Sequence, residues 1–255
     1  MSRILLFSIL ASYTVLSLFS CDSIMEDRSA CPCFVTLDFS GTDTSVGRLD
    51  LWFLASDGEI LARDTILKEN YLLPYNVRLA KDMVGCHVWG NPDTDSLYYS
   101  GTELDATGET VHEYIEVCRE YADIYLILDG SEGDGILSSW ITCSTSGRGI
   151  DGEYIEQEHI VSGIKEIDSD GNLFFRYRII RQKSMEKMKL AVSTYSYEGS
   201  KVVNSYDLGG WLSAIGYDME AENLEDVVIG ADFSFSCFNI EVEAWNIKKS
   251  IVITI

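Results

Sequence analysis

Residues 34–39, FVTLDF, alternate between apolar and polar side chains. Val35, Leu37 and Phe39 therefore share one face of an extended chain, and the residues between them share the other. A period of two residues predicts a β-strand with one face in a core and the other in solvent. The fold class follows from how often such segments recur.

They recur along most of the chain. The apolar run 49–55 is closed by Asp57 and Gly58, and an Asp-Gly pair before a second run is typical of a β-hairpin. Further strand patterns cover residues 75–79, 86–89, 124–128, 160–167, 173–182, 189–195, 201–206, 233–245 and 251–255. Short strands in two sets predict an all-β fold of two β-sandwiches in tandem. Because Gly and Ser cluster within residues 129–155, we place the sandwiches at 31–140 and 141–255.

One segment has a helical pattern instead. Thr110 and Glu113 have the spacing of a capping box, and apolar side chains follow at helical intervals up to Cys118. We therefore expect a short helix over residues 110–122, in the first sandwich. Residues 208–226 are expected to form a loop with one short helical turn.

Composition limits the partners. The 255 residues include 41 acidic and 19 basic side chains, for a formal net charge of −22. Binding to phosphates needs clustered Lys and Arg, so this charge argues against nucleic acid as a partner. A hydrophobic content of 46% also argues against a disordered acidic tail.

The N-terminus is predicted to be a lipoprotein signal peptide, residues 1–20. Arg3 precedes an apolar stretch, residues 4–18, that is shorter than a membrane-spanning helix. Ser20 and Cys21 close a segment that resembles the lipobox of bacterial lipoproteins, in which the cysteine is acylated. We expect a lipid on Cys21 and a tether over residues 21–30; an ordinary signal peptide followed by a disulfide cysteine is the alternative.

Six further cysteines make an even number, and an exported chain can form disulfides. Fifteen pairings are possible, and the sequence does not choose among them. Some of the six could instead be buried thiols. The possible disulfide cysteines are Cys31, Cys33, Cys86, Cys118, Cys143 and Cys237.

Motifs of catalysis and cofactor binding are weak. Residues 147–152 match G-x-G-x-x-G, but no helix pattern follows, so a loop between the sandwiches is expected. Residues 184–187 match S-x-x-K without its companion motifs. His87, His112 and His159 lack the spacing of a metal site. We expect no enzyme, cofactor or metal, although a hydrolase built on two of the many carboxylates stays conceivable.

Several segments together resemble the fimbrillin-associated anchor family of Bacteroidota, the minor-fimbria anchor subunits of the type V pilus system. The resemblance lies in residues 31–39 with Cys-Pro-Cys, 49–53 with the Asp-Gly turn, 87–91 (HVWGN) and 238–245. It implies two transthyretin-like, Greek-key sandwiches in an outer-membrane lipoprotein that anchors or assembles fimbriae. Its partners would be fimbrial subunits, joined by strand addition, and the outer membrane through the lipid on Cys21.

Two questions stay open within this resemblance. Polymerising relatives lose an N-terminal strand by proteolysis after an Arg; cleavage at Arg48 would also remove the lipid, so an anchor should keep Cys21. The alternative function is a surface glycan-binding lipoprotein of a nutrient-uptake system. Trp211 and Trp245 could form a sugar platform, whereas Trp52 and Trp89 fit a core.

Overall fold

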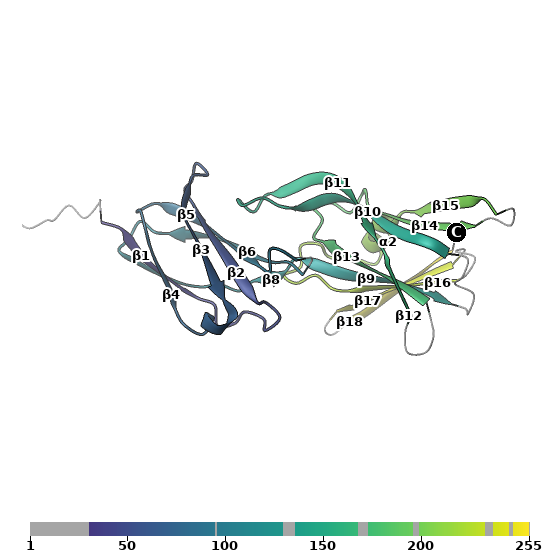
Figure 1. The fold of residues 1–255 in the computed structure, drawn as a ribbon, viewed down its shortest axis with the longest axis horizontal. Helices are drawn as coiled ribbons and strands as arrows, with labels where there is room; N and C mark the ends of the chain where they lie inside the picture. Colours follow the sequence, from purple (N-terminus) through teal and green to yellow (C-terminus); the bar gives the residue numbers. More distant parts are fainter. Residues whose placement is uncertain are drawn as a thin grey trace, which may run out of the picture.

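Two β-sandwiches lie end to end in the computed structural model (Figure 1). The structure describes residues 31–94, 96–129, 136–167, 173–195, 199–232, 237–244 and 247–254. Each sandwich has its own core, and the buried side chains form two separate clusters. The predicted all-β class is confirmed. No helix in these described ranges is long and apolar enough to cross a membrane.

The first sandwich packs a three-stranded sheet on a five-stranded one. The smaller sheet has the order β4 (Tyr75–Leu79), β1 (Cys33–Asp38), β7 (Thr110–Tyr114). The larger has the order β3 (Ile60–Leu67), β2 (Arg48–Leu54), β5 (Met83–Gly90), β6 (Tyr98–Asp105), β8 (Cys118–Arg119), and the one-turn helix η1 (Lys68–Asn70) follows β3. As the alternation predicts, Val35, Leu37 and Phe39 are buried between the sheets. The expected Asp-Gly hairpin joins β2 and β3, with Gly58 at φ +86°.

The second sandwich packs a four-stranded sheet on a six-stranded one. The smaller sheet has the order β11 (Tyr154–Ser162), β10 (Ile136–Arg148), β14 (Lys189–Tyr195), β15 (Lys201–Tyr206). The larger has the order β12 (Ile164–Ile167), β13 (Leu173–Ile180), β9 (Tyr121–Asp129), β16 (Val227–Asp232), β17 (Cys237–Ala244), β18 (Ile247–Thr254). Helix α2 (Leu208–Ala214) is the short helical turn expected within residues 208–226.

The prediction of a helix over residues 110–122 is wrong, because the segment is extended. This segment forms β7, β8 and the start of β9, and β7 pairs in parallel with β1, Phe34 opposite Thr110. Ile115 and Val117 are buried while Tyr114 is about half exposed, so burial here follows a two-residue period. The apolar residues fit both periods, and the pairing with β1, more than seventy positions away in the chain, decides between them.

The strand pairing also moves the boundary between the sandwiches. Strand β8 pairs with β6 of the first sandwich, whereas β9 pairs with β13 and β16 of the second. The chain therefore crosses at Glu120, not near residue 140. The Gly-rich stretch that suggested a linker connects β9 and β10, two strands of the same sandwich.

Candidate functional site

The predicted lipidation site and one of the six possible disulfide cysteines lie outside the part of the chain whose side chains the structure describes. Cys21 precedes the first described residue, and the side chain of Cys237 is likewise outside it. Among the cysteines whose side chains the structure describes, all are free thiols: Cys31, Cys33, Cys86, Cys118 and Cys143. Disulfide pairing and acylation stay predictions.

Burial makes three of these thiols poor nucleophiles. Desolvation raises the pKa of Cys86 and of Cys143 to about 12, and that of Cys118 to about 11. Cys31 is exposed, whereas Cys33 is fully buried in the first core. The Cys-Pro-Cys segment thus places one thiol in solvent and one in the core, which suits a structural role for Cys33.

The joint between the sandwiches is centred on Glu120. Its backbone N–H donates to the carbonyl of Leu97 in the first sandwich at 3.0 Å, and its own carbonyl accepts from the N–H of Arg181 in the second at 2.7 Å. Its side chain is 7% exposed and accepts from Nε of Arg181 at 2.8 Å and from Nε of Arg148 at 3.0 Å. One carboxylate therefore compensates two guanidinium groups beside the crossing point.

Arg181 extends this network into the loop after helix α2. Its guanidinium donates to the carbonyls of Met219, Ala221 and Glu222, and to that of Arg119 at 3.3 Å. Since the side chain is only 6% exposed, its charge needs these acceptors. The loop is thereby held against the last strand of the first sandwich.

A second group of ionic contacts reinforces the joint. Arg178 binds both oxygens of Asp123, at 2.8 and 2.7 Å, and reaches Ser96 of the first sandwich at 2.5 Å. Arg119 of β8 pairs with Asp226, next to β16. Both guanidinium groups also lie over the ring of Tyr121, at 4.2 Å for Arg119 and 4.4 Å for Arg178.

The turn between β10 and β11 docks on the outer face of the first sandwich. Gly152, at φ +78°, lies so close to Tyr99 and His87 that a Cβ there would be 2.0 Å from the Tyr99 hydroxyl. That hydroxyl is 2.7 Å from Nδ1 of His87, and the Arg148 guanidinium lies 4.8 Å from the centre of the Tyr99 ring. Burial lowers the pKa of His87 and raises that of Tyr99 to about 12, so the pair is neutral at pH 7.

The remaining sequence motifs have structural places. Residues 147–152 form this docked turn, with the N–H of Gly152 bonded to the carbonyl of Gly149 at 2.9 Å. Trp89 is buried, as expected; Trp52 is half-buried and Trp211 packs against the second core, while Trp245 lies outside the described residues. In the part of the chain that the structure describes, no three His, Cys, Asp or Glu side chains are placed to hold a metal ion.

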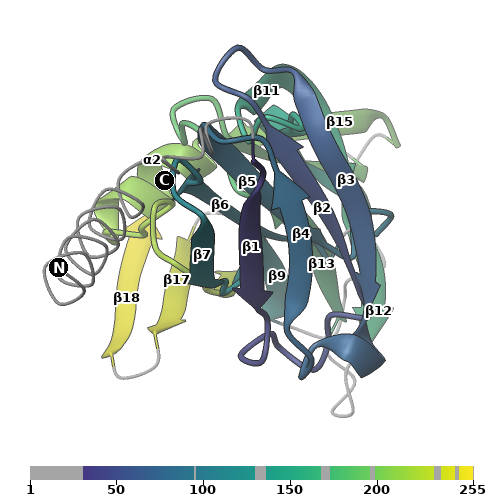
Figure 2. The same cartoon turned by 90° about the vertical axis from the view of Figure 1, so that its left-hand side faces the viewer.

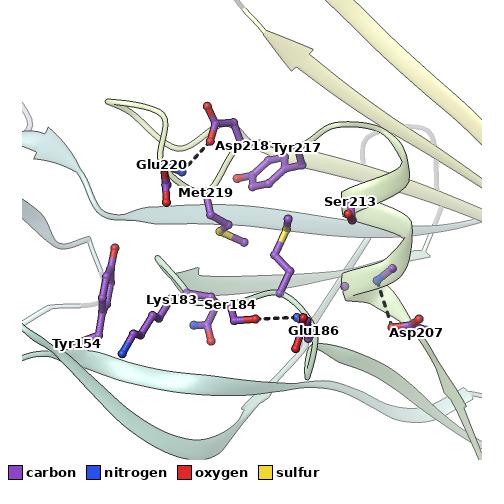
Figure 3. Close-up of a pocket in the computed structure, with 14 residues that line it drawn as sticks. Tyr154, Lys183, Ser184, Glu186, Asp207, Ser213, Tyr217, Asp218, Met219 and Glu220 are labelled. Atoms are coloured by element: carbon purple, nitrogen blue, oxygen red, sulfur yellow. Dashed lines mark hydrogen bonds between the residues drawn. The ribbon is translucent and has the colours of Figure 1, made fainter.

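A hollow of about 630 Å³ lies in the second sandwich (Figure 3). It is bounded by the start of β11, the segment after β13, helix α2 and the loop after α2. Figure 3 shows Met219 reaching from this loop toward Ser184, with Tyr154 and Lys183 at one side. Asp207 caps α2 by accepting from the N–H of Gly210 at 3.1 Å.

Strand edges are the other exposed feature. Strand β18 ends the six-stranded sheet, and within the described chain it pairs with β17 alone. Its Val252 is 66% exposed, while Ile251 and Ile253 pack on the second core. In Figure 2, β17 and β18 project beside the first sandwich rather than behind it. An edge of this kind presents unpaired backbone groups to a further strand.

The sequence could not identify the joint. Its ion pairs link residues 28 and 61 positions apart, Arg148 and Arg181 with Glu120, and charged residues are common in this chain. The one local signal is Arg181 directly after the apolar end of β13, where a buried strand would continue.

Comparison with known proteins gives matches in structure alone. No protein-family model and no curated protein sequence matches the chain. The fimbrial anchor protein Mfa2 of Porphyromonas gingivalis superimposes with a TM-score of 0.60 at 14% identity, covering 84% of this chain and 98% of Mfa2. A DUF1812 protein of Bacteroides thetaiotaomicron, described as a candidate polysaccharide-binding protein, gives 0.62 at 13% identity over 88% and 98% of the two chains. A candidate adhesin of Bacteroides ovatus gives 0.57 at 11% over 87% and 96%. The chain therefore has the two-sandwich fold of Mfa2 and of these Bacteroides proteins, as the sequence resemblance implies.

Proposed function

We propose that this protein is a non-enzymatic surface subunit that anchors or assembles fimbriae, held in the outer membrane by a lipid on Cys21. The observation that carries the proposal is the match with the Mfa2 anchor over both sandwiches and nearly the whole of that chain. Neither sandwich is an insertion or an addition relative to it. The adhesin-like neighbour supports the same location at the cell surface.

A fixed joint suits a load-bearing subunit. If one end is tied to the membrane and the other holds a fimbria, tension passes through the crossing at Glu120. The chain there is bonded to both sandwiches by its backbone, and ion pairs to Arg148 and Arg181 fix it to the second. Separating the sandwiches would also break the ion pair between Arg119 of the first sandwich and Asp226 of the second.

Retention of the N-terminal strand supports an anchor rather than a cleaved, polymerising subunit. Arg48 begins β2, a central strand, and its carbonyl accepts from the N–H of Asn91 at 2.9 Å. The next residue, Leu49, is fully buried. A protease needs an extended, accessible segment, so cleavage after Arg48 would require β2 to leave the sheet. Strand β1, and with it Cys21, then stays on the mature chain.

Strand addition would join the anchor to the first fimbrial subunit. Strand β18 pairs with β17 on one side, and its other edge, which no strand of the described chain covers, carries the exposed Val252. Main-chain hydrogen bonds to such an edge supply affinity, and alternate side chains supply specificity. We place the contact with a fimbrial subunit at this edge.

The test compares two cysteine substitutions ten positions apart. Cys21→Ser removes the proposed lipid site, and Cys31→Ser, at an exposed thiol, is the matched control. Fimbriae and the protein should appear in the medium with the first variant and stay on cells with the second. Cell-bound fimbriae in the Cys21→Ser strain would contradict the proposal.

Glycan binding remains the second candidate because of one surface feature. Trp52 is half-buried on the outer face of the first sandwich, and the Arg63 guanidinium lies 5.9 Å from the centre of its ring. Asp50, Asp64 and Thr65 line a hollow of about 300 Å³ beside it. An indole next to carboxylates and a hydroxyl is a common setting for sugars. Binding of outer-membrane or host glycans that Trp52→Ala abolishes would favour this function.

A further inference from the structure

The groove in the second sandwich has two connected parts. The hollow of about 630 Å³ adjoins a second one of about 450 Å³, and both are lined by Lys183, Ser184 and Glu186. The second part lies along β10 and β11, with Glu156 and Glu158 at its edge. The two hollows thus adjoin each other along the segment 183–186, and we call them together the methionine groove.

The floor of the methionine groove is apolar and deformable. Met219 is 8% exposed, Met185 is partly buried, and Tyr154 and Tyr217 stand beside them. Methionine side chains have three rotatable bonds and a polarisable sulfur, so they adapt to differently shaped apolar partners. Such a floor favours a partner that inserts apolar side chains.

The rim carries an excess of negative charge. Its carboxylates number six and its amines two, a balance of −4, and all eight side chains are exposed. Lys183 is already paired with Glu156, which leaves Lys187 as the other cation. The carboxylates are Glu156, Glu158, Glu186, Asp207, Asp218 and Glu220.

The walls are held in place before any partner arrives. Helix α2 lies so close to the segment after β13 that a Cβ on Gly209 would be 1.8 Å from the carbonyl of Met185, and the N–H of Gly209 donates to the Met188 carbonyl at 3.0 Å. On the other side, Arg181 holds the carbonyls of Met219 and Ala221. A preformed groove loses little conformational entropy on binding.

The distribution of negative charge in the groove favours a cationic chain over a metal ion as its ligand. The six carboxylates spread along both parts of the groove, and no three of them in the described chain converge to hold a metal ion. A spread of negative charge over an apolar floor is complementary to a chain that alternates cationic and apolar side chains. We propose that the methionine groove binds an extended peptide segment in which Lys or Arg alternates with apolar residues. This proposal is independent of the fimbrial role.

The experiment uses the mature lipoprotein in neutral-detergent micelles, with empty micelles as the blank. The probe is a short fluorescein-labelled peptide in which Lys alternates with Leu, and its counterpart has Glu in place of Lys. The site variant is Glu186→Gln with Glu220→Gln; the control, Glu59→Gln with Glu69→Gln, makes the same charge change at exposed positions of the first sandwich. The site pair should weaken binding about tenfold and the control pair less than about twofold.

Methyl NMR locates the peptide independently of charge. Methyl signals of Met185 and Met219 should shift and saturate with the Lys-Leu peptide, while Met83, exposed on the first sandwich, should not move. Equal weakening by the two variant pairs, a Met83 shift as large as the groove shifts, or binding of the Glu-Leu peptide would overturn the proposal.

Discussion

Nε of Arg181 donates to Oε1 of Glu120 at 2.8 Å, and both side chains are almost completely buried. The same carboxylate accepts from Nε of Arg148 through its other oxygen, at 3.0 Å. Glu120 is also the residue at which the chain leaves the first sandwich for the second. The crossing residue is thus fixed to the second sandwich by a buried, charged contact, while its backbone N–H is bonded to Leu97 of the first.

The substitution Glu120→Gln should destabilise the protein by about 3 kcal/mol, because the buried guanidinium of Arg181 and the partly buried one of Arg148 lose their counter-charge. The free energy of unfolding from urea titration measures this loss. Glu166→Gln removes the partner of Arg176 at an exposed position, and should cost less than about 1 kcal/mol. Equal losses in the two variants would show that the joint is not held by charge.

Contact across the joint is tested by a pair of glycine substitutions. Gly152 and Gly58 both have positive φ, +78° and +86°, so an alanine is strained at each by about 1–2 kcal/mol. At Gly58 the new methyl meets open space, whereas at Gly152 it meets the hydroxyl of Tyr99. Gly152→Ala should therefore also change the angle between the sandwiches, seen by small-angle scattering, and Gly58→Ala should leave it unchanged.

Thiol reactivity should follow burial. At pH 8 iodoacetamide should label Cys31 rapidly, while Cys33, Cys86 and Cys143 react only after unfolding, because the last two have a pKa of about 12 and all three are buried. Peptide mapping by mass spectrometry locates the label. Failure of iodoacetamide to label Cys31 in the native protein would contradict this prediction. If Cys31 is then labelled after reduction, it forms a disulfide.

Stability should also depend on pH through His87. Its pKa in the folded protein is lowered by burial from the usual 6.5, so the unfolded chain binds the proton more tightly. Its contribution to stability is therefore fully present above pH 6.5 and is lost as the pH falls through the folded pKa. Asp151, facing His87 from the β10–β11 turn, acts in the opposite direction but does not prevail. The contribution of His87 is measured as the difference in unfolding free energy between wild type and His87→Gln over this pH range. A difference that does not change with pH would contradict the prediction.

Local patterns in the sequence predicted the strands well where one face is buried. The alternation in residues 34–39 and the Asp57-Gly58 turn gave β1 and the β2–β3 hairpin with the correct buried face. The error at residues 110–122 has a physical cause: local spacing favours a helix, but the partner strand β1 is distant in sequence. The methionine groove and the joint could not be predicted from the sequence for the same reason. Both are formed by segments that are distant in the chain and that only the tertiary fold places side by side.

The most direct test of the anchor role is to extract the tagged protein gently from native outer membranes and to identify its N-terminus and its partners by mass spectrometry. An anchor should carry an acylated Cys21 at its N-terminus, keep the Arg48–Leu49 bond intact and co-purify with fimbrial subunits. A chain that begins at Leu49, or a lipidated chain that co-purifies with a porin-type transporter and no fimbrial subunit, would contradict this role.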